Sequence, residues 1–224
     1  MTSSVPLAKR GKFITFEGGE GTGKSTQVRL LAERLASVGV DVVATREPGG
    51  SPHAEALRNV LLSGFGARLG AQGEALLFTA ARIDHLDTTI LPALAVGKFV
   101  ISDRFIDSTL AYQGVLGDVD GELIAVLERV AIGEHRPDLT ILIDLTPEVG
   151  LARAARRRGS EGADRFEGED LAFHTRLREA YLAIARAEPA RFLVVDGAQS
   201  VSTLADRIWR EVAERFSLLA EAVA

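Results

Sequence analysis

The sequence predicts an α/β protein in which helices flank both faces of a five-stranded parallel sheet. Two observations support this fold class. Short β-rich runs alternate with helical patterns along the chain, and a glycine-rich loop directly follows the first run. With 224 residues, 46% of them hydrophobic, the chain can bury one sizeable core. We therefore expect residues 1–224 to form a single domain.

The five predicted strands are apolar runs that lie far apart in the sequence. They cover residues 12–16, 40–45, 99–102, 139–144 and 192–195. Because helical segments separate them, the connections have the length of crossovers and the strands should run parallel. Ligands of such open sheets bind beyond the carboxyl ends of the strands, so functional residues should follow each run.

The first predicted strand leads into residues 18–25, Gly-Gly-Glu-Gly-Thr-Gly-Lys-Ser, which match the pattern G-x-x-x-x-G-K-[ST]. In this pattern, backbone N–H groups surround phosphate oxygens, Lys24 reaches the outer phosphates and Ser25 reaches a magnesium ion. Apolar residues then recur with helical spacing until Gly39 ends the helix. A plain glycine-rich turn is the alternative, but the strand-loop-helix context favours a nucleotide-phosphate site.

The later helical patterns are less regular. Residues 72–91 predict one long helix, and Pro92 and Gly97 mark its end region. Alanine-rich segments at 119–133 and 201–223 also predict helices, which pack either inside the domain or against a partner. The inward positions of the long helix are expected to be Leu76, Leu77, Ala80 and Ile83.

Composition excludes several classes of protein. The net charge of −5 gives no overall basic field for nucleic acid, and only four of the 26 basic residues are lysines. The absence of cysteine excludes disulfides, thiolate catalysis and cysteine-ligated metal sites, and the four histidines lack metal-ligand spacing. The first twelve residues contain no hydrophobic signal region, and no run of 18 apolar residues occurs. A soluble, cytoplasmic protein is expected.

Charged residues and glycines follow the next predicted strands, as a ligand site requires. Residues 46–50 read Arg-Glu-Pro-Gly-Gly, and Asp103 closes the third strand. Opposite Ser25, the Asp103 carboxylate is placed to hold magnesium through water. A surface ion pair with Arg104 is the alternative. A second phosphate, separate from the nucleotide triphosphate, would suit the guanidinium groups of Arg46, Arg82 and Arg104.

Five segments between Lys12 and Trp209 carry a more specific pattern. They are residues 16–26 (FEGGEGTGKST), 45–50 (TREPGG), 103–105 (DRF), 108–114 (STLAYQG) and 164–167 (DRFE). In order and separation they resemble the thymidylate kinase family, of the bacterial type with basic residues in the lid. The resemblance implies a P-loop NTPase fold with a small lid at about 153–167, ATP as phosphate donor, Mg²⁺, dTMP as acceptor and a homodimer.

The resemblance also implies roles at the acceptor site. Arg46 and Arg104 would hold the dTMP phosphate, Phe78 would stack on thymine, and Arg82 would bond a thymine carbonyl. Alone, Phe78 would more often be a core residue, but the four-residue spacing from Arg82 places both on one helix face. The other implied substrate-binding residues are Glu20 at the 3′-hydroxyl, Pro48, Ser108, Thr109, Tyr112 against the deoxyribose, and Gln113 as a base contact or helix cap.

On the donor side, the resemblance assigns phosphate binding to the loop and Gln199 to the adenine. The ATP-binding residues are Gly18, Gly19, Glu20, Gly21, Thr22, Gly23, Lys24, Ser25, Thr26 and Gln199, with Ser25 and Asp103 at the metal. Glu20 is acidic where some members of the family place a catalytic arginine. Lid arginines then replace it, and Arg153, Arg156, Arg157 and Arg158 are present to do so. The expected catalytic residues are Lys24, Arg104, Arg153, Arg156 and Arg158.

Other functions remain as alternatives. A kinase for another nucleoside monophosphate would use the same loop and lid. A GTP-dependent switch needs an Asn-Lys-x-Asp guanine reader, and none of the four lysines follows an asparagine. A non-catalytic nucleotide-binding module would not require Lys24, Ser25 and Asp103 together.

Overall fold

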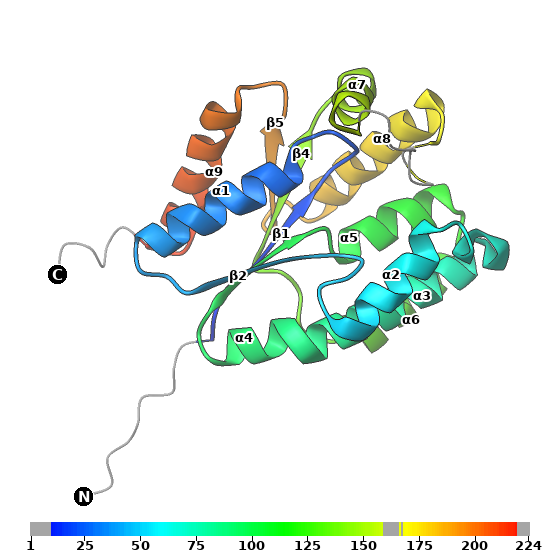
Figure 1. Ribbon diagram of the computed structural model, residues 1–224, viewed down its shortest axis with the longest axis horizontal. Coiled ribbons are helices and arrows are strands. Elements are labelled where there is room, and N and C mark those ends of the chain that lie inside the picture. Colours follow the sequence, from blue (N-terminus) through cyan, green and yellow to red (C-terminus); the bar gives the residue numbers. More distant parts are fainter. Residues whose placement is uncertain (1–9, 159–165, 167, 219–224) are drawn as a thin grey trace, which may run out of the picture.

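The computed structural model describes residues 10–158, 166 and 168–218. Its sheet confirms the predicted fold class: five parallel strands lie in the order β2-β3-β1-β4-β5 (Figure 1). The strands are β1 (Phe13–Glu17), β2 (Val42–Arg46), β3 (Phe99–Asp103), β4 (Leu139–Asp144) and β5 (Phe192–Asp196). Each predicted strand is present, and the bounds differ by at most two residues.

Helices connect the strands and lie on both faces of the sheet (Figure 1). They are α1 (Lys24–Ser37), α2 (Pro52–Leu62), α3 (Gly70–His85), α4 (Leu91–Ala95), α5 (Ile106–Thr109), α6 (Gly121–Ile132), α7 (Pro147–Arg158), α8 (Leu171–Ala187) and α9 (Val201–Arg215). A short 3₁₀ turn at Gly66–Leu69 precedes α3, and π-helical segments at Leu86–Ile90 and Leu110–Leu116 continue α3 and α5.

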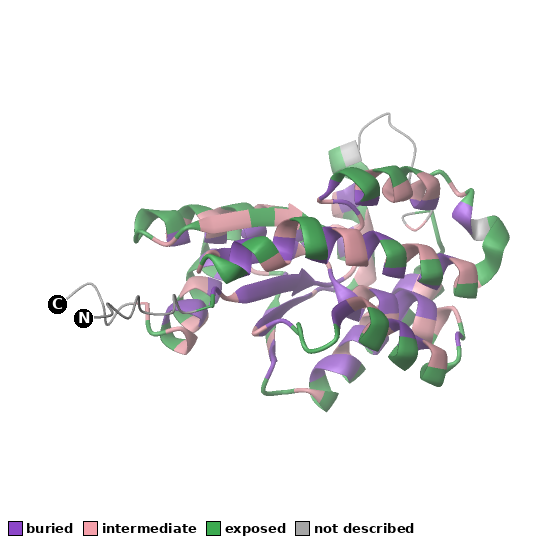
Figure 2. Ribbon diagram, turned by 90° about the horizontal axis from the view of Figure 1, so that it is seen from below, coloured by how far each residue is buried: buried purple, intermediate pink, exposed green. Residues whose placement is uncertain are grey.

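The alternation of side chains along β1 divides the core into two faces. Ile14 and Phe16 pack with α1 and α9, whereas Phe13 packs on the opposite face with the segment leading into α4. The central strands β1, β3 and β4 are almost entirely buried between the helices (Figure 2), whereas the edge strands β2 and β5 are partly exposed. Thr15 and Glu17 also point to that opposite face, and both are 0% exposed. The sheet therefore places polar groups beneath α5 and α8.

The predicted orientation of the long helix is wrong. Leu76 is 54% exposed and Ala80 is exposed as well, while Leu77 and Ile83 are half-buried. The buried positions of α3 are Glu74, Ala75, Thr79, Ala81, Arg82 and His85. Several of these are polar, because Arg82 and His85 find a buried carboxylate partner on a distant loop. Apolar periodicity does not reveal such a partner.

Other helix boundaries also differ from the expectation. Pro92 lies in the first turn of α4, directly after the π-helical segment Leu86–Ile90, and helical structure continues to Ala95. The segment 119–133 forms α6, and α9 ends at Arg215. Of the predicted lid, residues 153–158 belong to α7, whereas 159–165 and 167 lie outside the described residues. Among the described helices, none has the length and apolar character needed to cross a membrane.

Candidate active site

The glycine-rich loop joins the end of β1 to the first turn of α1, as predicted. Gly18, Gly21 and Gly23 have positive φ angles of 138°, 66° and 96°, which favour glycine. A Cβ atom on Gly21 would lie 1.9 Å from the carbonyl oxygen of Gly150 in α7, so the loop also packs tightly on that helix. Backbone N–H groups at the start of α1 therefore face a position suited to phosphate.

Lys24 lies at the centre of this loop. Its Nζ donates hydrogen bonds to the carbonyl oxygens of Gly18 and Gly19, at 3.0 and 2.8 Å. Burial and the nearby charge of Arg104 lower the pKa of Lys24 below its ordinary value. The ammonium group is thus held inside the phosphate loop, in the position that a triphosphate would approach.

Ser25 and Asp103 meet at the carboxyl ends of β1 and β3. The Ser25 hydroxyl donates to Asp103 Oδ2 at 2.6 Å. A hydroxyl and a carboxylate beside a phosphate loop form an oxygen-only donor set, which fits Mg²⁺. In the described part of the chain, no group of three or more His, Asp or Glu side chains is placed to hold a metal ion, so phosphate and water would supply the remaining ligands.

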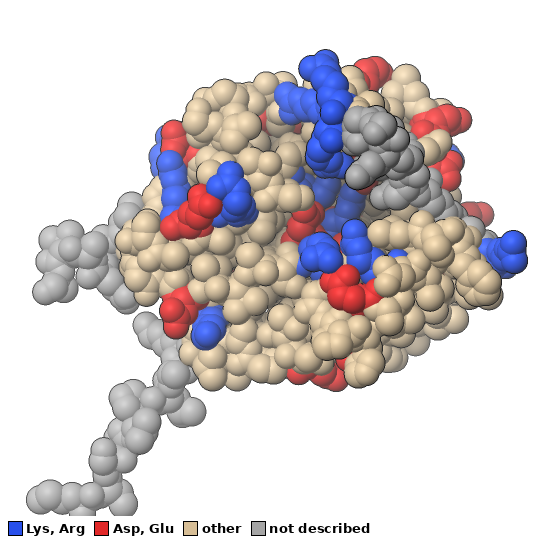
Figure 3. All heavy atoms as spheres, viewed as in Figure 1, with Lys and Arg blue, Asp and Glu red and all other residues tan. Residues whose placement is uncertain are grey.

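A cleft of about 500 Å³ extends from this loop across the carboxyl edge of the sheet. Figure 3 shows basic side chains over α7, next to a hollow in this face of the molecule. Most of the predicted site residues line the cleft: Glu20, Gly21, Thr22, Gly23, Lys24, Ser25, Thr26, Arg46, Pro48, Phe78, Arg82, Asp103, Arg104, Ser108, Thr109, Tyr112 and Gln113. Residues from the phosphate loop and from four distant segments thus share one cavity.

Arg104 connects the loop to the rest of the cleft. Its backbone φ of 70° lies in the left-handed region, which is strained for a residue with a side chain. The guanidinium donates to Glu20 at 2.5 Å, to the Tyr181 hydroxyl at 3.1 Å and weakly to Ser108 at 3.4 Å. Burial opposes the charge, but Tyr112 and Glu20 hold the pKa of Arg104 well above its ordinary value. Arg104 is therefore a fixed cation.

Glu17 lies beneath Arg104 and is 0% exposed. Its carboxylate accepts hydrogen bonds from the Phe105 N–H at 2.8 Å, from Ser108 at 2.7 Å and from Tyr181 at 3.1 Å. Burial, followed by the charge of Asp107, raises the pKa of Glu17 from 4.5 to about 7. One carboxyl group thus connects the end of β1 with α5 and α8.

Arg82 lies at the centre of a second buried hydrogen-bond network. Its guanidinium donates to Glu47 Oε2 at 2.8 Å, to Thr109 Oγ1 at 3.0 Å and to the Phe105 carbonyl at 3.1 Å. The other Glu47 oxygen lies 3.0 Å from His85 Nδ1. The Glu47–Pro48 peptide bond is cis. These contacts join α3 to the β2 loop and to α5.

Aromatic side chains line the far end of the cleft. Phe78 is half-buried, and its ring centroid lies 6.4 Å from that of Phe166. Tyr112 packs edge-on against Phe166, with ring centroids 5.2 Å apart. Arg46, at 52% side-chain exposure, pairs with Glu55 at 2.8 Å. The cleft thus changes from charged groups at the loop to rings at its far end, which suits a phosphate attached to a base.

The lid arginines do not share one environment. Arg153 donates to the carbonyl oxygen of Gly197, Arg156 is exposed and outside the cleft lining, and Arg157 lines the cleft. The side chain of Arg158 lies outside the described residues. Gln199 occupies the turn between β5 and α9, near the Arg153 contact but outside the cleft lining.

Sequence reasoning missed several residues of the site. Glu17, Glu47, Arg58 and Tyr181 contact predicted site residues, and Arg58 donates to the Pro48 carbonyl at 2.7 Å. Tyr181 offered a weak signal, because the chain has only two tyrosines and the other was predicted. Its sequence distance from the other site residues concealed the connection.

A phosphate loop at the edge of a parallel sheet, next to an arginine-lined second pocket, defines a P-loop NTPase fold with the site of a nucleotide kinase. The comparisons with known proteins agree. The family model described as "Thymidylate kinase" matches residues 16–208. The chain belongs to the thymidylate kinase family, whose members are nucleoside monophosphate kinases.

Individual relatives cover nearly the whole chain. A thymidylate kinase of Nitrobacter winogradskyi is 54% identical, over 96% of this chain and 94% of the relative. One of Bradyrhizobium diazoefficiens is 56% identical, over 92% of this chain and 90% of the relative. The crystal structure of a thymidylate kinase from Ehrlichia chaffeensis superposes with a TM-score of 0.72 at 35% identity, covering 91% and 98% of the two chains.

Proposed function

We propose that this protein transfers the γ-phosphoryl group of ATP to dTMP, giving dTDP and ADP. Membership of the thymidylate kinase family supports this reaction. The single observation that carries it is the position of Arg104, which is fixed between the phosphate loop and the aromatic end of the cleft. A nucleoside monophosphate would fit this site beside ATP, with its phosphate bound to the Arg104 guanidinium and its base among the aromatic rings.

On the donor side, residues 18–26 bind the phosphates of ATP. Lys24 neutralises the charge that develops during transfer, and Ser25 with Asp103 holds Mg²⁺. Held by these two residues, Mg²⁺ would supply positive charge that reduces the repulsion between the donor phosphates and the incoming acceptor. Gln199 and Arg153 lie together beside the β5–α9 turn, which suits a position near the adenine.

On the acceptor side, Arg104 and Arg46 hold the dTMP phosphate, and the Glu20 carboxylate accepts a hydrogen bond from the 3′-hydroxyl of the sugar. Phe78 stacks on thymine. Arg82 bonds a thymine carbonyl, since a guanidinium has five N–H donors. Three of them donate the hydrogen bonds described above, and Nη2 also lies 2.7 Å from Glu47 Oε2, which leaves one N–H of Nη1. The remaining base and sugar contacts come from Pro48, Ser108, Thr109, Tyr112 and Gln113.

The transfer needs positioning and charge rather than a strong base. The acceptor is a phosphate monoester with a second pKa of about 6, so its oxygen is already ionised at neutral pH. Arg104 places this oxygen in line with the γ-phosphate, and arginines of α7 stabilise the charge on the transferred group. Among them, Arg157 is the best placed, because its side chain lines the cleft.

We further propose a homodimer that works in the cytoplasm. Val126 and Val130 on α6 are 42% and 65% exposed, and Leu76 on the neighbouring α3 is 54% exposed. These apolar side chains suit burial against a second copy. Analytical ultracentrifugation should give twice the monomer mass, and Val130→Glu should shift the protein toward monomer. A wild-type protein that sediments as a monomer would contradict this proposal.

The function is tested by ADP release with ATP and Mg²⁺ across a set of acceptors. We expect selective turnover of dTMP over dUMP, UMP, dCMP, AMP and GMP, with little ADP released in the absence of an acceptor. If the protein prefers another nucleoside monophosphate, the proposed mechanism would still hold, but the proposed contacts to thymine would be wrong. Release that does not depend on an acceptor would indicate an ATPase or a switch.

A further inference from the structure

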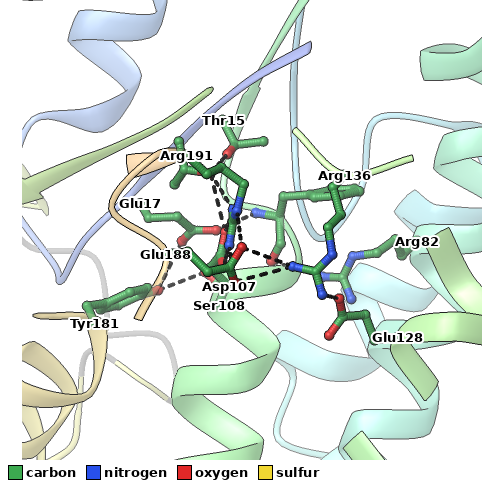
Figure 4. A network of polar contacts seen from close by, with 12 residues as sticks. Thr15, Glu17, Arg82, Asp107, Ser108, Glu128, Arg136, Tyr181, Glu188 and Arg191 are labelled. Atoms are coloured by element: carbon green, nitrogen blue, oxygen red, sulfur yellow. Dashed lines mark hydrogen bonds and ion pairs between the residues drawn. The ribbon is translucent and has the colours of Figure 1, made fainter. Parts of the chain in front are cut away.

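A buried ion pair lies beneath the acceptor side of the cleft. Arg191 Nη2 donates to Asp107 Oδ1 at 2.7 Å, and Nη1 donates to Oδ2 at 2.8 Å. The side chains are only 9% and 2% exposed, and neither belongs to the described lining of the cleft. Figure 4 shows Arg191 at the centre of a wider polar network, with Arg136 and Glu128 at its outer end. The pair thus lies outside the cleft lining and supports the elements that form its acceptor side.

Stability alone is a weak reason for this pair. Removing two charges from water costs several kcal/mol, and apolar residues of similar size often replace such pairs without loss. Here the strands also supply polar partners: Arg191 Nη1 donates to Thr140 Oγ1 at 2.7 Å, and Thr140 lies 2.9 Å from Thr15 Oγ1. Polar groups occupy facing positions on β1 and β4 where an apolar core would serve equally well. These polar groups are better explained by a role of the ion pair in positioning the elements around the cleft.

Asp107 anchors a helix that has little stability of its own. Helix α5 has four residues and no side-chain cap at its start, and it continues into a π-helical segment. The two residues after Asp107 face the cleft, where Ser108 donates to Glu17 and Thr109 accepts from Arg82. Fixing Asp107 therefore fixes this wall of the cleft.

Arg191 also holds the end of α8. Its Nε donates to Glu188 Oε2 at 2.9 Å, and its Nη2 donates to Glu188 Oε1 at 3.0 Å. About two helical turns earlier, the Tyr181 hydroxyl accepts from Arg104 and lies 2.8 Å from Ser108 Oγ. One guanidinium thus ties together the two elements that flank Arg104.

We propose that Asp107 and Arg191 are positioning residues of the acceptor site. Together they hold α5 and α8 at the separation in which Ser108 and Tyr181 orient Arg104 toward the acceptor phosphate. This inference rests on the proposed function, with dTMP as the acceptor. The pair itself touches neither nucleotide.

The experiment compares acceptors with and without a phosphate. Arg191→Lys and Asp107→Asn each lose the paired hydrogen bonds, and the KM for dTMP should rise at least about tenfold, because a small misplacement of a positioning group is costly. The KM for ATP should stay within about twofold of wild type. Thymidine has the base and sugar but no phosphate, so its inhibition constant should change much less than the KM for dTMP.

Arg136→Gln is the matched control. Arg136 bonds the same Glu188 at 3.3 Å but does not contact Asp107, so this variant should keep the wild-type KM for dTMP. If a single variant is unfolded, the double variant Asp107→Asn with Arg191→Gln retains polar partners without buried charge. It should fold and show the same selective rise.

Three results would overturn the inference: an unchanged KM for dTMP in folded variants, an equal loss for thymidine and dTMP, or failure of all three variants to fold. The last two would assign the pair a general structural role. Failure of the wild-type protein to use dTMP in the same assay would instead reject the proposed function.

Discussion

The two halves of the active site are built in different ways. The phosphate loop is local: eight consecutive residues supply the glycines, Lys24 and Ser25, and Lys24 bonds carbonyls only five and six positions away. The acceptor side is assembled from distant segments, with 84 positions between Glu20 and Arg104 and 164 between Glu17 and Tyr181. Loss of the Lys24 ammonium group should therefore affect mainly catalysis, whereas changes in the acceptor side should also affect folding.

The largest effect is expected at the loop. Lys24→Met removes the ammonium group that neutralises the transferring phosphate, and turnover should fall by about 10³-fold. The melting temperature should change little, because the lost hydrogen bonds lie within the loop itself. Steady-state kinetics and thermal unfolding of the same preparation test both parts. A marked loss of thermal stability would break the contrast between the two halves.

The next effect concerns the stability of the acceptor side. Arg82→Met leaves the buried Glu47 carboxylate without its guanidinium partner, and the free energy of unfolding should fall by about 3 kcal/mol. Urea unfolding measures this change. Arg29→Met, which breaks the exposed pair with Glu33, is the control and should cost at most about 0.5 kcal/mol. Equal costs for the two variants would mean that the buried pair does not hold the site together.

A smaller effect separates neighbouring arginines of the lid. Arg157 lines the cleft and Arg156 does not, so Arg157→Ala should lower kcat roughly tenfold while Arg156→Ala stays within about twofold of wild type. Matched kinetics of the two variants at saturating ATP and dTMP test this difference. The reverse order would assign the transferring phosphoryl to Arg156.

The smallest effect is a change in pH dependence. The pKa of Glu17 is raised from 4.5 to about 7 in the folded protein, so between these values the folded state keeps a proton that the unfolded state has lost. This contribution to stability is complete below pH 4.5 and is lost as the pH rises through 7. Glu17→Gln should flatten the fall in melting temperature across this range. The exposed control Glu33→Gln should keep the wild-type slope, and a wild-type slope in Glu17→Gln would contradict the assignment.

The same contrast explains what the sequence could predict. The five strands, the loop and the Ser25–Asp103 pair follow from local patterns and from the rule that ligands meet at one edge of a parallel sheet. The orientation of α3 does not, because a buried partner at Glu47 outweighs the apolar spacing of Leu76 and Ala80. The partner becomes visible only when the β2 loop and α3 are seen side by side.

Individual residues of the acceptor side also show which roles a single sequence can and cannot predict. Arg104 was predicted from its guanidinium after the third strand, and Phe78 and Tyr112 through resemblance to a family; all three line the cleft. Tyr181 and Glu17 were not predicted, since their roles depend on hydrogen bonds across most of the chain. Long-range polar contacts of this kind leave no spacing pattern in one sequence.

Equilibrium binding of both nucleotides to Arg104→Ala tests the division of the site most directly. Isothermal titration should show the Kd for dTMP raised by at least about tenfold, because the phosphate loses its bidentate partner. The Kd for ATP with Mg²⁺ should remain within about twofold of the wild-type value. Equal weakening of both nucleotides, or unchanged binding of dTMP, would contradict an acceptor site built separately from the phosphate loop.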